Sequence, residues 1–136
     1  MINKLLYGIT DKLYELFKYT VIVNNVEQGF QEPCFYVKQL NTQRIQQLGL
    51  RSKRDVNFDI HFFPSEGSEQ INSVAQTLLD EMDIITLSDG DLVYGYNLRT
   101  EVADDVLHFF VNYNVIVTKE TPDIDKMEEI EIGERA

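Results

Sequence analysis

Residues 105–119 read DVLHFFVNYNVIVTK, and this stretch separates into two rows when every second residue is taken. Successive side chains of an extended strand point to opposite faces, so each row would lie on one face of a sheet. The first row is wholly hydrophobic and consists of Leu107, Phe109, Val111, Tyr113, Val115 and Val117. The pattern therefore predicts a long strand that covers a core. At about 3.3 Å per residue the strand would extend about 45–50 Å, so it either bends or projects beyond its sheet.

The second row of this stretch is mixed in character. It consists of Val106, His108, Phe110, Asn112, Asn114 and Ile116. Val106, Phe110 and Ile116 make this row too apolar for a face that lies wholly in water. We therefore expect part of the face to be buried against another subunit.

A second alternating stretch, at residues 51–63, mirrors the first. Its apolar row is Val56, Phe58, Ile60 and Phe62, and its other row is Asn57, Asp59, His61 and Phe63. Two strands of nearly equal length and matched alternation are natural neighbours in one sheet. The pairing predicts a long two-stranded ribbon whose ends extend beyond the helices.

The remaining elements follow from periodicity. Apolar residues recur at helical spacing in residues 2–18 and about 68–83, which predicts two amphipathic helices. Short strands are predicted at 19–23, 34–40, 84–87 and 92–100, whereas NTQRIQQLGL at 41–50 has no clear period and is expected to be a short helix or a loop. The order α-β-β-β-α-β-β-β predicts an α+β fold with a mostly antiparallel sheet of about five to six strands and both helices on one face.

Composition limits the possible partners. The chain has 136 residues, of which 43% are hydrophobic, and this suffices for one domain with a real core. Its net charge of −11 argues against nonspecific binding to nucleic acid or to an anionic membrane, so protein partners are expected. Its single cysteine, Cys34, excludes an internal disulfide framework and is expected to be buried. No signal peptide or membrane span is predicted, and the cytoplasm is the expected site of synthesis.

The acidic charge is concentrated at the carboxyl terminus. Residues 120–136 hold seven acidic side chains against Lys126 and Arg135, a local charge of −5. We therefore predict a domain over residues 1–119 and an acidic extension over residues 120–136. The apolar residues of the extension fit neither a helix nor a strand throughout, as expected of an arm that orders only on a neighbour.

No catalytic, cofactor or metal site is predicted. His61 and His108 lie in the polar rows of neighbouring strands and Asp59 is close by in sequence, so a metal or acid–base site is conceivable. No third strong ligand has a fixed spacing, and the chain has no HxH or HxxxH motif, so ordinary surface histidines are the favoured interpretation. The chain also lacks a complete calcium loop and a phosphate-binding glycine loop.

The only basic cluster lies at the start of the second alternating stretch and contains Arg51, Lys53 and Arg54. It is either a solvated strand end or a contact with acidic groups of another subunit. The candidate acidic groups are Glu101, Asp104, Asp105 and the carboxyl-terminal extension. Opposite charges on one chain permit head-to-tail rings.

Three segments resemble a family of small phage tail terminator proteins from phages of Gram-positive bacteria and from their defective prophages and phage-like particles. The segments are QGFQEPCFYVKQL at 28–40, RSKRDVNFDIHFFPS at 51–65 and DDVLHFFVNYNVIV at 104–117, and the resemblance spans about residues 1–119. It implies a structural protein without catalytic residues. The implied assembly is a ring, usually hexameric, that stops the tail tube at its head-proximal end and docks the head connector, with the sheath as a further partner in contractile tails.

Two alternatives remain open at this point. One is a head–tail connector or adaptor that joins existing rings without limiting tube length. The other, from a different class, is a small ligand- or metal-binding domain that uses His61 and His108. If the resemblance holds, the protein is made in the bacterial cytoplasm and ends in the tail or neck of a virion or phage-like particle.

Overall fold

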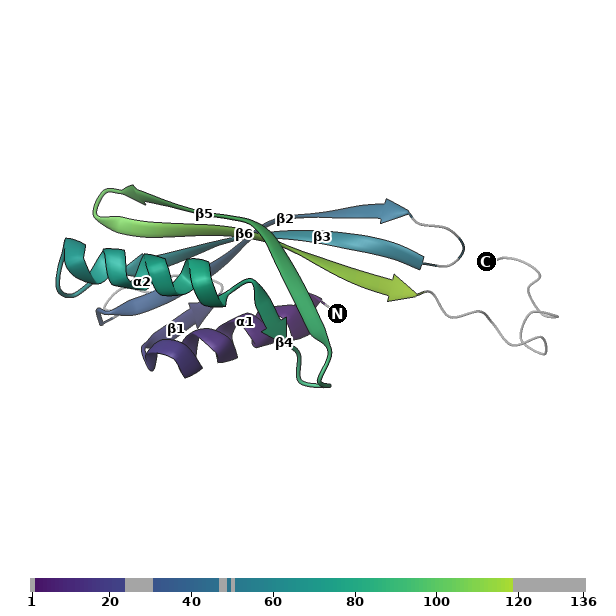
Figure 1. The fold of residues 1–136 in the computed structure, drawn as a ribbon, viewed down its shortest axis with the longest axis horizontal. Coiled ribbons are helices and arrows are strands. Elements are labelled where there is room, and N and C mark those ends of the chain that lie inside the picture. The colour runs from purple at the N-terminus through teal and green to yellow at the C-terminus, as the bar shows by residue number, and fades with distance from the viewer. Residues whose placement is uncertain (1, 24–30, 47–48, 50, 119–136) are drawn as a thin grey trace.

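The fold is one sheet with two helices on one of its faces (Figure 1). The computed structural model describes residues 2–23, 31–46, 49 and 51–118. Its elements are α1 (Ile2–Phe17), β1 (Thr20–Val23), β2 (Cys34–Gln46), β3 (Arg51–Phe63), α2 (Ser68–Glu81), β4 (Ile84–Thr86), β5 (Leu92–Ala103) and β6 (Val106–Thr118). The predicted α+β class and element order are confirmed. The predicted acidic extension lies outside the described residues.

The sheet has six strands in the order β1-β2-β3-β6-β5-β4. β1 runs parallel to β2, and every other neighbouring pair is antiparallel. The two long alternating strands, β3 and β6, are central neighbours, in register from the pair Arg51–Thr118 to the pair Phe62–Leu107. The predicted pairing of these two strands is therefore confirmed.

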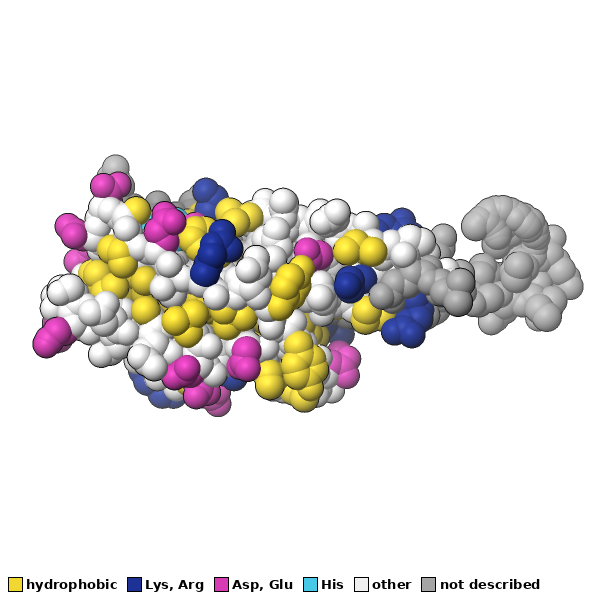
Figure 2. All heavy atoms as spheres, turned by 45° about the horizontal axis from the view of Figure 1, so that its top comes forward, with side chains coloured by type: hydrophobic (Ala, Val, Ile, Leu, Met, Phe, Trp, Pro, Cys, Tyr) yellow, Lys and Arg dark blue, Asp and Glu magenta, His cyan; other side chains and the backbone are white. Residues whose placement is uncertain are grey.

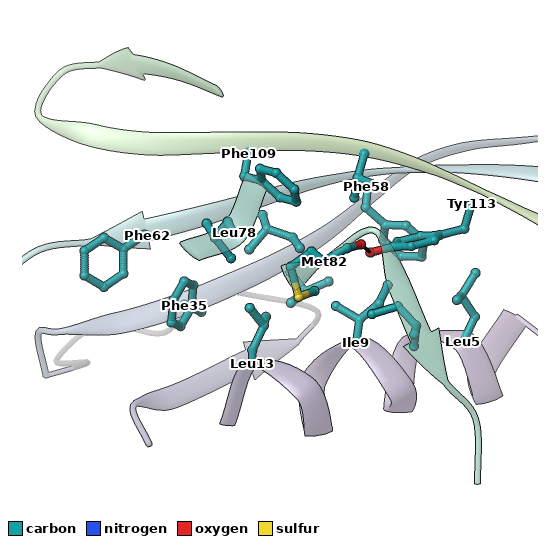
Figure 3. Packing of buried hydrophobic residues seen from close by; sticks show 14 of the residues in the cluster. Leu5, Ile9, Leu13, Phe35, Phe58, Phe62, Leu78, Met82, Phe109 and Tyr113 are labelled. Carbon is teal, nitrogen blue, oxygen red and sulfur yellow. Dashed lines mark hydrogen bonds between the residues drawn. The ribbon is translucent and has the colours of Figure 1, made fainter. Parts of the chain in front are cut away.

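The core lies between the sheet and the helices (Figure 3). α1 contributes the fully buried Leu5, Ile9 and Leu13 at helical spacing. The apolar row of β3 and the row of β6 from residue 107 to 115 are buried on the face of the sheet that the helices cover. Burying one such side chain stabilises the fold by about 1.5–3 kcal/mol, so these two rows fix which face of the sheet the helices cover. Cys34 is also fully buried, as predicted.

β5 is bent where it crosses the core. Its pairing with β6 runs from Ala103 to Gly95, with an irregularity between Tyr96 and Arg99, and residues 92–94 pair with β4 instead. A Cβ atom at Gly95 would lie 2.7 Å from Cε1 of Tyr113, so only glycine permits this close approach. The Tyr113 hydroxyl donates a hydrogen bond of 2.7 Å to the backbone oxygen of Met82, just after α2.

The prediction of a short helix or loop at 41–50 is wrong for the described residues 41–46. These residues continue β2 past an irregularity between Gln39 and Asn41 and pair with β3. Hydrogen bonding to a long partner strand decides their conformation, although their side chains are all exposed and show no period.

This end of the sheet projects beyond both helices (Figure 1). We call it the distal ribbon and define it as residues 43–46 of β2, 51–55 of β3 and 114–118 of β6, which pair with one another in register. β1 pairs only with residues 34–37 of β2, and β5 pairs with β6 only up to Tyr113. Within the described part of the chain, both outer edges of the ribbon therefore lack a neighbouring strand. The length of β6 allowed either a bend or a projection, and the structure shows that β6 projects beyond the helices (Figure 1).

Candidate assembly surface

The candidate surface is the face of the sheet opposite the helices, which we call the helix-free face. It carries the second rows of β3 and β6, and the register aligns these with residues of β2 and β5. One row across four strands is Tyr36, His61, His108 and Glu101; the next is Lys38, Asp59, Phe110 and Arg99. The face therefore combines aromatic, acidic, basic and imidazole groups in fixed positions.

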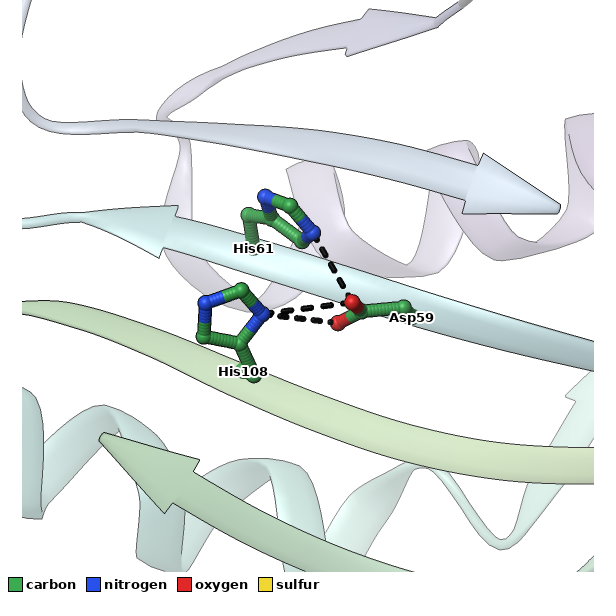
Figure 4. A network of polar contacts seen from close by, with 3 residues as sticks. All are labelled: Asp59, His61 and His108. Atoms are coloured by element: carbon green, nitrogen blue, oxygen red, sulfur yellow. Dashed lines mark hydrogen bonds and ion pairs between the residues drawn. The ribbon is translucent and has the colours of Figure 1, made fainter. Parts of the chain in front are cut away.

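Asp59 and the two histidines form one cluster near the middle of this face (Figure 4). His61 Nε2 lies 2.9 Å from Oδ2 of Asp59, and His108 Nδ1 lies 3.2 Å from the same oxygen. Their side chains are only 11–21% exposed. Alternation placed both histidines on one face, but only the register, in which His61 and His108 are direct partners, brings them to one carboxylate.

The cluster keeps Asp59 ionised. Burial of the carboxyl group opposes ionisation, but the hydrogen bonds from His61 and His108, with the positive charge that these rings carry when protonated, together outweigh it and hold the pKa of Asp59 below its usual value. The rings are flanked by aromatic side chains. Tyr36 meets His61 edge-on at 5.3 Å between ring centroids, and Phe110 stacks with His108 at 6.2 Å.

The predicted basic cluster lies in the distal ribbon and is divided between two faces. Arg51 and Lys53 belong to the row of His61 and lie on the helix-free face, whereas Arg54 alternates to the other side. There the Arg54 guanidinium donates a hydrogen bond to Oγ of Ser52. The three residues form one cluster in the sequence, but the alternation of the strand separates them.

The predicted acidic residues lie at the opposite end of the sheet. Glu101 is near the end of β5, and Asp104 and Asp105 form the two-residue turn between β5 and β6, with φ values of 53° and 62°. The pairs Arg51–Thr118 and Phe62–Leu107 mark the two ends of the β3–β6 ladder, which lie about 37 Å apart at the usual strand rise.

The two charged ends are visible in Figure 2, with acidic side chains around the β5–β6 turn and Lys and Arg side chains near the distal ribbon. All three acidic side chains and Arg51 are exposed. Among the residues that the structure describes, none of these basic or acidic side chains forms a salt bridge with another. Each end is therefore free to pair with charge on another molecule.

The predicted apolar residues of this face are all partly accessible. Val106 and Phe110 are half-buried, and Ile116 is 41% exposed in the distal ribbon. Ile116 lies in one row with Lys53 and Ile45 across the three strands of the ribbon. The guanidinium of Arg99 lies 4.3 Å over the ring of Phe110. This mixture of apolar and cationic groups is typical of a protein–protein contact.

Two asparagines that alternation places on this face have a property that the sequence does not reveal. Asn57 Oδ1 and Asn114 Oδ1 are buried acceptors without a hydrogen-bond partner in the described chain. Such an atom costs about 1–3 kcal/mol unless a donor reaches it. Asn114 also lines a groove of about 370 Å³ between the start of β5 and the end of β6, together with Tyr94, Val115 and Ile116. The groove lies where β5 leaves β6 to pair with β4, and this change of partner depends on tertiary structure, so no sequence signal locates it.

Comparison with known proteins identifies the family to which the chain belongs. A family model described as phage tail terminator protein matches residues 4–125, which include nearly all of the described fold. No curated protein matches the chain. None of the described helices is long and apolar enough to cross a membrane. The match confirms the resemblance seen in β2, β3 and β6, and the family implies contacts with other tail and head–tail proteins. The chain belongs to the phage tail terminator protein family, a family of structural proteins of the virion tail.

Proposed function

We propose that the protein forms a closed hexameric ring that caps the head-proximal end of a tail tube. The ring stops tube polymerisation and gives the head connector a docking surface, and in a contractile tail it also meets the sheath. Membership of the family supports the tail terminator role. The ring proposal rests on one observation. The two ends of the sheet carry opposite charges, and the described side chains of these ends form no salt bridge with each other.

The proposed subunit contact is head-to-tail. Arg51 and Lys53 of one copy face Glu101, Asp104 and Asp105 of the next, and Arg54 supports the same contact from the other side of the ribbon. Such a contact joins two different patches, so it generates a ring when the rotation between copies closes. The unpaired edges of the distal ribbon support this arrangement, because an exposed strand edge readily associates with another chain.

The helix-free face takes part in the same proposal. Val106, Phe110 and Ile116 would be covered by the neighbouring copy, which removes their apolar surface from water. A neighbour can also donate hydrogen bonds to the unpartnered Oδ1 atoms of Asn57 and Asn114. We further propose that residues 1–119 form the ring-building domain and that residues 120–136 are an extension available to the tube or connector.

Charge reversal tests the contact. Arg51→Glu with Lys53→Glu should give monomers by light scattering at concentrations where the unaltered chain forms rings, and so should Glu101→Lys with Asp104→Lys. All four changes in one chain restore opposite charges across each contact, so ring formation should return. Asp80→Lys, on the exposed side of α2, is the matched control and should not affect assembly. A four-fold variant that folds yet stays monomeric would contradict the proposed contact.

Tail length tests the role. Particles assembled without the protein should carry overlong tubes, because nothing ends polymerisation. Tubes of normal length without heads would instead support the connector or adaptor function, which joins rings without limiting their number. Electron microscopy of negatively stained particles measures both outcomes directly.

A further inference from the structure

We propose that Asp59, His61 and His108 form a binding site for a zinc-like divalent cation on the helix-free face. The site offers two imidazole nitrogens and one carboxylate oxygen, which together are a donor set typical of Zn²⁺. Mg²⁺ and Ca²⁺ prefer oxygen ligands throughout, so the two nitrogens select against them. The proposal does not rest on ring formation, although both proposals concern the helix-free face.

The spacing of the donor atoms fits such an ion. In a tetrahedral zinc site with bonds of about 2.0–2.1 Å, ligand atoms lie about 3.3 Å apart. The nitrogen-to-oxygen distances are 2.9 Å for His61 and 3.2–3.3 Å for His108, and all three ligand atoms lie within 4.8 Å of one another. The two nitrogens are at most 4.8 Å apart, so binding of the ion would draw them towards the separation of about 3.3 Å that a tetrahedral site requires.

The same atoms serve both as hydrogen-bond partners and as ligands. A neutral imidazole carries its proton on one of two ring nitrogens. With the proton on His61 Nε2 or His108 Nδ1, the ring donates to Asp59. When the proton moves to the other nitrogen, the lone pair points at the centre of the cluster. The change of tautomer therefore exchanges two hydrogen bonds for two metal bonds, with no net proton released from a neutral ring.

The sheet holds the three ligands in place. Asp59 and His61 are two residues apart on β3 and so share one face, and His108 is the direct partner of His61 on β6. Both strands are central in the sheet, and sites built on such elements are more rigid than sites on loops. Figure 4 shows the three side chains in front of the strands with the helices behind. The fourth coordination position therefore faces the helix-free side, where water or a group from another chain can enter.

A competing interpretation is that the histidines only satisfy the buried carboxylate of Asp59. Titration of the full-length protein, first freed of metal by a chelator, distinguishes the two. We expect Zn²⁺ to bind with one-to-one stoichiometry by calorimetry, Co²⁺ to give the intense visible absorption of a tetrahedral site, and Mg²⁺ to produce neither effect. The ring resonances of both histidines should shift on Zn²⁺ addition, a readout that needs no variant.

Variants test the ligands individually. His108→Gln and Asp59→Asn should each weaken Zn²⁺ binding by at least about 100-fold, since even a change in the surroundings of a ligand costs about 10–100-fold. Asp55→Asn is the matched control, because it removes a carboxylate from the same row of β3, four residues from Asp59, and should leave the affinity unchanged. Zn²⁺ binding that leaves the histidine resonances unmoved, affinity retained in His108→Gln, or no one-to-one binding by the unaltered chain would each overturn the proposal.

Discussion

At the scale of single residues, Tyr113 links three elements through one side chain. It belongs to the apolar row of β6, its ring fits against Gly95 of β5, and its hydroxyl reaches the backbone oxygen of Met82 after α2. Burial raises the pKa of Tyr113, so the hydroxyl stays protonated and remains a donor. A tyrosine in a core is tolerated where its hydroxyl finds such a partner.

Removing this hydroxyl should therefore cost stability. We expect Tyr113→Phe to lower the free energy of unfolding by about 1–2 kcal/mol, because the buried oxygen of Met82 loses its donor. Chemical denaturation followed by circular dichroism measures the change. Tyr94→Phe makes the same substitution at a side chain that is 61% exposed and should have almost no effect. Equal effects of the two variants would show that the hydrogen bond contributes nothing.

At the scale of elements, the turn between β5 and β6 is strained by its sequence. Positive φ at both central residues identifies a type I′ turn, for which Asn-Gly is the preferred pair. This chain has Asp104 and Asp105 there, and a non-glycine residue in the left-handed region costs about 1–2 kcal/mol, somewhat less for Asp. Two adjacent carboxylates also repel each other. The cost is consistent with a turn whose charge serves the proposed subunit contact.

Replacing this turn should stabilise the monomer while weakening assembly. Asp104→Asn with Asp105→Gly should raise the free energy of unfolding by about 0.5–1 kcal/mol, because both positions then accept positive φ readily. Asp104→Asn with Asp105→Asn removes the same two charges without introducing glycine and should give only part of the gain. Denaturant midpoints measure stability, and light scattering measures assembly. An unchanged midpoint would mean that the turn stores no strain.

The elements also show where sequence reasoning reaches its limit. Both helices and both long strands could be predicted because each buries one face and therefore has a period. Residues 41–46 bury neither face, so their strand depends on pairing with β3 and has no signal of its own. The same holds for the Asp59 cluster. Alternation predicts the face of each side chain, but the contact between His108 and Asp59 depends on register and could not be predicted.

At the scale of the whole molecule, the described fold contains a complete core. Among the described residues, all buried members of the hydrophobic cluster lie between Leu5 and Val115. A chain that ends at residue 119 should therefore fold, and its free energy of unfolding should lie within about 0.5 kcal/mol of the full-length value. A chain that ends at residue 111 loses Tyr113 and Val115 and should not fold cooperatively. A large loss of stability in the first truncation would contradict the proposed division at residue 119.

Ionic strength tests which forces hold the ring together. The proposed contact combines two or three exposed charge pairs with the apolar groups Val106, Phe110 and Ile116, and these respond to salt in opposite ways. Exposed pairs are worth about 0.5 kcal/mol each and are screened as the Debye length falls from about 10 Å at 0.1 M to about 3 Å at 1 M salt. Burial of apolar surface is not weakened by such screening.

If the charged ends dominate, the dissociation constant for subunit association should rise about tenfold between 0.1 and 1 M NaCl, as measured by sedimentation velocity. This factor corresponds to the loss of about 1.4 kcal/mol, roughly what two or three such pairs supply. The variant with all four charges exchanged should show the same dependence, and so should the Asp80→Lys control. Association that strengthens with salt would instead mean that the apolar groups of the helix-free face hold the copies together and that the charged ends only select their orientation.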